Sequence, residues 1–179
     1  MLPLLLVSLM LVGQAASSEA PKLPEPSKKL IQAAERGEVD KLRSLTGDPG
    51  LLNPDKKGRT ALTAAGEKGQ RATFKELLEI VSQRAHQEGA RVAREGQSSI
   101  PALMAAVQAR MEFFSTPNKD GVTPLMFAAH HGWEDLARTL LENGAPSDSI
   151  DKKGRSAADY AQAAGFNALA QTIKDHPKN

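Results

Sequence analysis

Apolar and polar positions recur along most of the chain with the spacing of short amphipathic helices. Residues 118–150 carry two such apolar faces, formed by Leu125, Ala128 and Ala129 and then by Leu136, Leu140 and Leu141. Thr123 is placed to cap the first helix, Pro124 suits its first position, and Gly132 can end it in the left-handed conformation. The pattern predicts a unit made of a turn, a helix, a second turn and a second helix.

This unit recurs several times, with a period of about 33 residues at the C-terminal end. In the last copy, Gly154, Ala161, Gly165, Leu169 and Ile173 take the places of Gly121, Ala128, Gly132, Leu136 and Leu140. Earlier copies place apolar residues at Leu30, Ala33, Ala34, Val39, Leu42 and Leu45, and at Leu62, Ala65, Leu77 and Leu78. Repetition of one helical pair predicts an all-α solenoid in which each unit packs on the next.

The repeated unit resembles the ankyrin repeat. The segment TPLMFAAHHG at residues 123–132 is similar to the family hallmark TPLHxAAxxG, with Met126 in place of the usual histidine. The resemblance implies about four helix-turn-helix repeats, near residues 27–54, 55–82, 118–150 and 151–174. It also implies a domain that binds another protein on the concave surface made by its turns and first helices.

The copies are interrupted after Leu78, and we predict a helical insertion over residues 83–117. The second helix of the preceding repeat would lengthen into it, with breaks near Gly89 and Gly96, and a further helix would start at Pro101. One stripe of that helix, which we expect to pack on the stack, comprises Leu103, Val107, Met111 and Phe114. A decayed extra repeat is the alternative, but no TPLxxAA-like run falls in register.

The N-terminal residues predict export. Met1–Val12 is an apolar run followed by small residues, which is typical of a signal peptide cleaved near residue 18. This run is shorter than a membrane-spanning helix requires. The proline-rich residues 19–26 predict an extended linker. An exported chain of this kind is similar to the small periplasmic ankyrin-repeat proteins of bacteria, so we expect a periplasmic protein.

Composition narrows the function classes. The 23 basic and 21 acidic residues give a formal net charge of +2, so no strong field favours a nucleic acid or an anionic membrane. The absence of cysteine excludes disulfides, thiolate catalysis and cysteine-ligated zinc. His130 and His131 are adjacent and point apart on a helix, which makes them poor joint metal ligands. We therefore expect no enzymatic activity, no cofactor and no metal.

The candidate partner-binding residues lie on the predicted turns and on the exposed side of the first helices. They are Lys56, Lys57, Arg59, Lys119, Val122, Met126, His130, His131, Trp133, Lys152, Lys153 and Arg155, with Phe113 added from the insertion. Trp133, the sole tryptophan, would be a natural binding anchor. Two alternatives stay open: the lysines only keep the stack soluble, and Trp133 packs over a neighbouring helix or the insertion.

These patterns together predict a protein-binding module, monomeric when free, that acts sterically. We expect it to bind and inhibit a periplasmic enzyme, such as a cell-wall hydrolase that would harm the producing cell. The alternative is a scaffold or stabiliser of a periplasmic enzyme such as a catalase.

Overall fold

The computed structural model describes residues 28–45, 47, 51, 53–95 and 100–176. The predicted signal peptide and linker, residues 1–26, lie outside the described residues. In the described part, all regular elements are helices, and the one β-type contact is an isolated bridge between Ile150 and Ser156. No helix in this part is long and apolar enough to cross a membrane.

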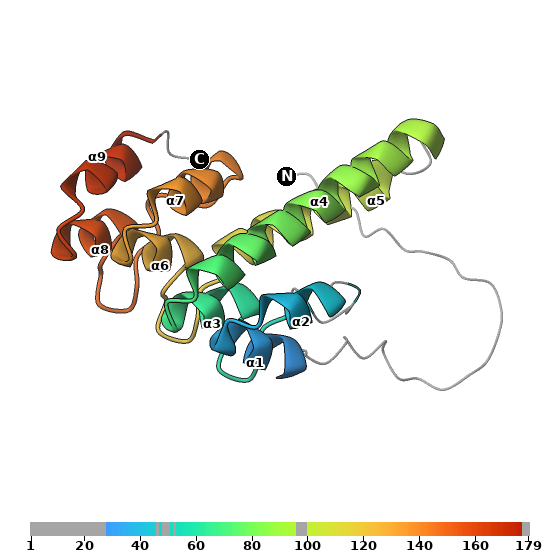
Figure 1. The fold of residues 1–179 in the computed structure, drawn as a ribbon. Coiled ribbons are helices and arrows are strands. Elements are labelled where there is room, and N and C mark those ends of the chain that lie inside the picture. Colours follow the sequence, from blue (N-terminus) through green and yellow to red (C-terminus); the bar gives the residue numbers. More distant parts are fainter. Residues whose placement is uncertain (1–27, 46, 48–50, 52, 96–99, 177–179) are drawn as a thin grey trace, which may run out of the picture.

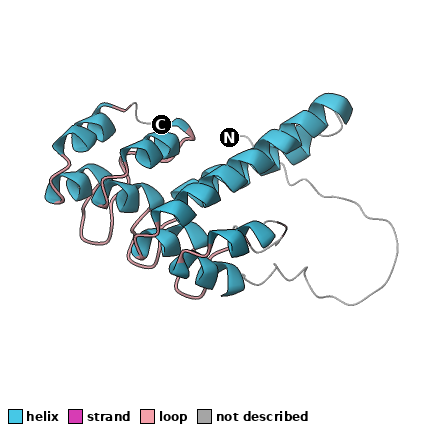
Figure 2. Cartoon of the chain, viewed as in Figure 1, coloured by secondary structure: helices cyan, strands magenta, loops and turns pink. Residues whose placement is uncertain are grey.

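The helices form two layers along a curved stack (Figures 1 and 2). The inner layer contains α1 (Lys28–Arg36), α3 (Ala61–Glu67), α6 (Pro124–His130) and α8 (Ala157–Ala163). The outer layer contains α2 (Val39–Ser44), α4 (Arg71–Glu95), α7 (Glu134–Glu142) and α9 (Asn167–Asp175), and α5 (Ile100–Ser115) lies beside α4. Each inner helix contacts the next inner helix and its own outer partner. The order of elements is the one that the repeated sequence pattern predicts.

Local sequence explains where the inner helices begin. Thr60, Thr123 and Ser156 precede α3, α6 and α8, and each side-chain oxygen accepts a hydrogen bond from the backbone N–H three residues later. The third helical residue bonds back to the cap in all three repeats. At that position the Met126 sulfur accepts from the Thr123 N–H at 3.4 Å, which draws the methionine into the core.

The core consists of leucines and alanines between the two layers, with three buried phenylalanines, Phe74, Phe113 and Phe114. Small residues let neighbouring inner helices approach closely. A Cβ atom added at Gly66 of α3 would lie 2.7 Å from the Cβ of Phe127 on α6, so a larger residue cannot be accommodated there without a shift. This glycine costs helix propensity but allows α3 and α6 to pack.

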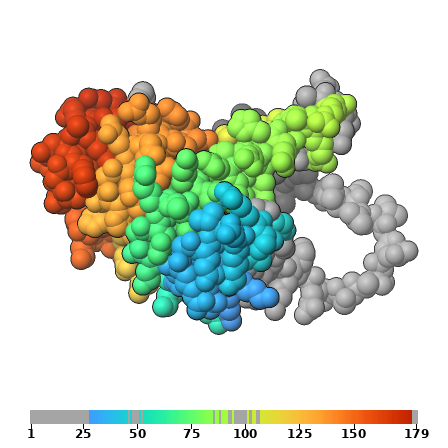
Figure 3. Space-filling model, in the orientation of Figure 1, coloured from blue at the N-terminus to red at the C-terminus, as the bar shows by residue number. Residues whose placement is uncertain are grey.

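The insertion is a helical hairpin built from the second half of α4 and from α5, which lie side by side (Figure 1), and Figure 3 shows the end of α4 projecting beyond the stack. It does not separate the repeats, because α3 contacts α6 directly. The expected break at Gly89 is wrong: α4 runs through it, and an added Cβ there would meet Leu103 of α5 at 3.8 Å. Gly96 lies outside the described residues.

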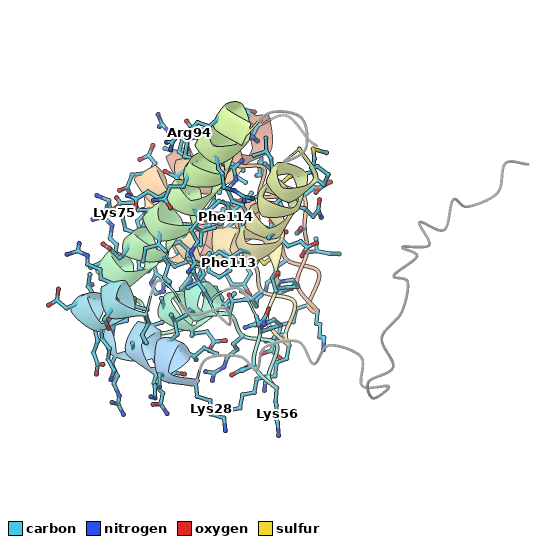
Figure 4. The ribbon with its side chains drawn as sticks, turned by 90° about the vertical axis from the view of Figure 1, so that its right-hand side faces the viewer. Lys28, Lys56, Lys75, Arg94, Phe113 and Phe114 are labelled. Carbon is cyan, nitrogen blue, oxygen red and sulfur yellow. The ribbon has the colours of Figure 1, made fainter. Side chains whose placement is uncertain are left out.

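The predicted packing stripe of α5 is only partly correct. Phe114 is fully buried, but Met111 is 40% exposed, and Leu103 and Val107 are half-buried. Phe113, expected at the surface, is 1% exposed (Figure 4). Both phenylalanines are buried because α5 contacts α4 as well as α6, so its end is enclosed from two sides.

Three turns project from the inner helices to the same side, and we call them fingers: residues 53–59, 116–122 and 149–155 (Figure 2). Backbone hydrogen bonds join them in series. The Lys119 N–H donates to the Lys57 carbonyl at 3.2 Å, and the Lys152 N–H donates to the Asp120 carbonyl at 3.0 Å. Consecutive fingers are thus held at backbone contact distance.

Gly121 and Gly154 provide a matched test of this contact. Both have a positive φ, +82° and +75°, but only at Gly121 would an added Cβ meet another finger, 3.0 Å from the Lys152 nitrogen. We expect Gly154→Ala to lower the free energy of unfolding by about 1 kcal/mol, the cost of a left-handed alanine. Gly121→Ala should lower it by about 2–4 kcal/mol, because it also overpacks the junction. Urea denaturation measures both, and equal losses would show that finger contact contributes nothing.

Candidate partner-binding groove

An open groove of about 550 Å³ lies between the fingers and the exposed side of α3, α6 and α8. Its lining comprises Lys57, Arg59, Gly66, Glu67, Asn118, Lys119, Asp120, Val122, Phe127, His130, His131 and Tyr160. The fingers supply one wall and the inner helices supply the floor. The groove therefore spans repeats that are far apart in sequence.

The first finger contains an ion pair that faces inward. The Asp55 carboxylate accepts from the Lys57 and Arg59 backbone N–H groups and from the Arg59 guanidinium, at 2.8–3.1 Å. Burial opposes ionisation, but these donors outweigh it and lower the pKa of Asp55. Arg59 also donates to Glu35 at 2.6 Å and lies 3.5 Å from Glu67. The arginine thus links repeats one and two, and its charge is matched by carboxylates within the molecule.

The last finger repeats this arrangement and extends it. The Asp151 carboxylate, 5% exposed, accepts from the Lys153 and Arg155 N–H groups, the Arg155 guanidinium and the Tyr160 hydroxyl. Burial opposes ionisation, but these donors together hold the pKa of Asp151 far below its ordinary value. Burial and the hydrogen bond to Asp151 raise the pKa of Tyr160 to about 12. Arg155 lies 4.5 Å from the centre of the Tyr160 ring.

The middle finger lacks both members of this pair. Asn118 replaces the aspartate, and Val122 replaces the arginine. The Asn118 side-chain oxygen still accepts from the Asp120 and Val122 N–H groups at 3.0 Å, and its amide nitrogen donates to Glu67 at 2.9 Å. Val122 is 9% exposed, so it forms part of the groove wall rather than a free surface.

His130, His131 and Trp133 differ in their exposure and in the groups that they contact. His130 is exposed in the groove, and its ring lies 6.2 Å from that of Tyr160. The His131 Nε2 lies 2.9 Å from the Gly66 carbonyl, which can only accept, so this nitrogen carries the proton. Trp133 stacks on His131 with ring centres 4.6 Å apart and meets the Phe74 ring at 5.2 Å.

In the structure, many of the predicted binding residues lie together in or beside the groove, and others are buried. Lys57, Arg59, Lys119, Val122, His130 and His131 line the groove. Lys56, Lys152, Lys153 and Arg155 lie on the first and last fingers and are mostly exposed. Trp133 is 9% exposed, and Met126 and Phe113 are 0% and 1% exposed. Met126 and Phe113 were expected at the surface, and that expectation is wrong because Met126 packs at the helix cap and Phe113 packs under α4. For Trp133, the alternative that it packs over a neighbouring helix is correct, because its ring meets Phe74 of α4.

Sequence reasoning missed several groove side chains: Glu67, Asn118, Phe127 and Tyr160. A signal for them was present in the repeat register. Phe127 and Tyr160 occupy the same position of successive repeats, as do Glu67 and His130. Aligning the repeats by position would have identified which helical positions face the groove.

The described residues contain no group of three or more His, Asp or Glu side chains that could hold a metal ion. Asp55 and Asp151, the acidic residues at the bases of the first and last fingers, are each occupied by hydrogen bonds that shape the turns. Such an arrangement holds a surface in place and offers contacts to a partner.

Comparisons with known proteins agree with this architecture. A family model described as ankyrin repeats in three copies matches residues 92–178. The chain is also similar to a chain in the crystal structure of the yeast ribosomal protein Rps3 in complex with its chaperone Yar1. The two chains share 21% sequence identity over 84% of this chain and 94% of that chain, with a TM-score of 0.58. The comparison with curated proteins gave no match.

The Asp151 cluster leads to a pH prediction. A carboxylate with a lowered folded pKa stabilises the fold above its unfolded value, ordinarily 3.8, and loses that contribution as the pH falls through the folded pKa. We expect Asp151→Asn to lower the urea midpoint at pH 7, with a difference from the parent that shrinks below pH 4 or so. The exposed Asp148→Asn serves as control. A difference that persists unchanged at pH 2–3 would show that shape, and not charge, is responsible.

Proposed function

From the ankyrin repeats that this chain contains, we propose that it is a protein-binding module whose groove holds a segment of a partner protein. The observation that carries the proposal is the open groove of about 550 Å³, with exposed lysines and His130 along walls fixed by buried contacts. A rigid scaffold with exposed polar and aromatic groups is suited to binding, because little order is lost on association.

The mode of action that we propose is steric. Ankyrin repeats are a binding scaffold. The groove side chains are hydrogen-bonded to neighbouring residues of the chain, and they are not arranged as a catalytic acid, base and nucleophile. A partner held in the groove would have its own surface covered. The module therefore acts by occupying that surface.

We extend the proposal to location and partner. The apolar N-terminal run and the small residues after it support export, so the chain would act in the periplasm. There it would bind and inhibit an enzyme, such as a cell-wall hydrolase, whose activity endangers the producing cell. The alternative is a scaffold or stabiliser of a periplasmic enzyme such as a catalase. The neighbouring structure, in which a ribosomal protein is bound by its chaperone, is a precedent for that alternative.

Capture of partners by purified residues 22–179 from the exported proteins of the producing cells tests the groove. Asp120 and His130 are exposed and line it, and neither belongs to the core. We expect the Asp120→Ala, His130→Ala double variant to bind the captured protein about tenfold more weakly, as loss of central contacts usually does. Titration of the purified pair by calorimetry measures the affinity.

Glu134→Ala, Arg138→Ala on the outer helix α7 is the matched control, since this exposed pair lies outside the groove. If both variants bind as the parent does, the groove is not the binding surface. Turnover of the captured partner then separates the two roles. A fall on saturation supports inhibition, whereas unchanged turnover with a higher melting temperature supports stabilisation.

A further inference from the structure

Five lysines lie along the three fingers, and all five are exposed: Lys56, Lys57, Lys119, Lys152 and Lys153. We call them the lysine row. Among the residues that the structure describes, none of these ammonium groups has an ion-pair partner. Lys28 of α1 lies beside the first finger and is also exposed, and Figure 4 shows Lys28 and Lys56 extending from the same side of the molecule.

The acidic groups near the row do not cancel its charge. Asp151 is matched by Arg155. Arg59 is shared by three carboxylates, those of Asp55, Glu35 and Glu67, so two of these negative charges are not matched by an arginine. The carboxylate oxygens of Asp55 and Asp151 are also occupied by backbone donors. Asp120 is the one exposed carboxylate among the described finger residues that line the groove. The five lysines with Arg59 and Arg155 carry seven positive charges, against five negative charges on Asp55, Asp120, Asp151, Glu35 and Glu67. The fingers therefore keep a local positive excess of two.

The outer face of the stack shows the contrasting arrangement. Four of its cations are paired with carboxylates: Arg43 with Glu76, Arg71 with Asp135, Lys75 with Glu79 and Arg138 with Glu134. The whole chain has a net charge of only +2. The positive excess is therefore a property of the finger side and not of the protein as a whole.

We propose that the partner segment held by the groove is acidic, with Asp or Glu carboxylates placed on Lys57 and Lys119 and apolar atoms placed over Phe127. This inference rests on the proposed function and specifies its partner. An acidic peptide fits better than a nucleic acid, because Glu67 and Asp120 line the same groove and would repel a phosphate at every step. A peptide can space its carboxylates to avoid them.

The test uses purified residues 22–179 and a fluorescein-labelled peptide of about ten residues, rich in glutamate with two phenylalanines. Fluorescence anisotropy measures its affinity, beside that of peptides with glutamine or lysine in place of glutamate and that of a single-stranded DNA of about ten nucleotides. We expect the acidic peptide to bind most tightly. Its affinity should fall as salt rises from about 0.05 to 0.3 M, because exposed charges are screened.

Two double variants with the same net charge test whether the groove lysines are responsible for binding the acidic peptide. Lys57→Glu, Lys119→Glu should weaken acidic-peptide binding about tenfold, since reversal replaces attraction by repulsion at two sites. Lys75→Glu, Lys174→Glu changes exposed lysines outside the groove and should weaken it less than about twofold. Figure 4 shows Lys75 on α4, well away from Lys56. Circular dichroism confirms that each variant is folded.

The outcomes separate this inference from the proposed function. If the glutamine or lysine peptide binds most tightly, and the Asp120→Ala, His130→Ala double variant loses that binding, the acidic partner is overturned. The proposal that the groove binds a protein segment then still stands. Equal weakening by both lysine variants would show a net-charge effect and overturn the inference. Tighter binding of DNA than of any peptide would overturn the acidic-peptide partner in favour of a nucleic acid. If no peptide binds, and the captured partner binds the groove variant as tightly as it binds the parent protein, the proposed function itself fails.

Discussion

None of the inner helices can bury its apolar face alone, and this constraint governs the whole structure. The inner helices α3, α6 and α8 are only 7 residues long, well below the length at which an isolated helix is stable in water. Their stability depends on close approach to neighbours on both sides. Alanine at the contact positions, and Gly66 opposite Phe127, allow that approach. The high alanine content of the repeated pattern is therefore a packing requirement.

The shape of each finger also determines how charge is distributed. In the first and last fingers, the aspartate at the base accepts hydrogen bonds from the N–H groups two and four residues later in its own finger. The arginine four residues later completes the shell around that carboxylate. In the sequence Asp-Lys-Lys-Gly-Arg, the two ends are thus used internally and the two lysines are left outside. The same constraint that builds the turn leaves the exposed side of the fingers positive.

The repeat pattern was sufficient to predict the fold, because periodic apolar positions and helix caps are local signals. The comparisons and the structure confirm an all-α ankyrin-repeat solenoid. In the structure, α3 contacts α6 directly although α4 and α5 lie between them in the sequence. The pattern was a weaker guide to which side chains are exposed at the surface. Trp133 follows a helix-ending glycine at a position that is usually polar, yet Phe74 from another repeat covers it. Contacts between repeats decide such exposures, and a single repeat does not reveal them. The same limit explains Phe113, whose burial depends on the contacts of α5 with α4 and α6.

The interruption between repeats two and three shows how the stack tolerates the insertion. There α3 and α6 must meet although 56 residues, 68–123, separate them, and closing a longer loop costs additional entropy. Three contacts are concentrated at this junction. Asn118 donates to Glu67, His131 donates to the Gly66 carbonyl, and Phe127 lies on Gly66.

The departures of this repeat from its neighbours, asparagine for aspartate and histidine beside the terminal glycine, are the residues that make these contacts. They join the repeats across the insertion and also line the groove. The groove therefore forms where the stack is interrupted, because the bonds that close the interruption are the bonds that shape its floor.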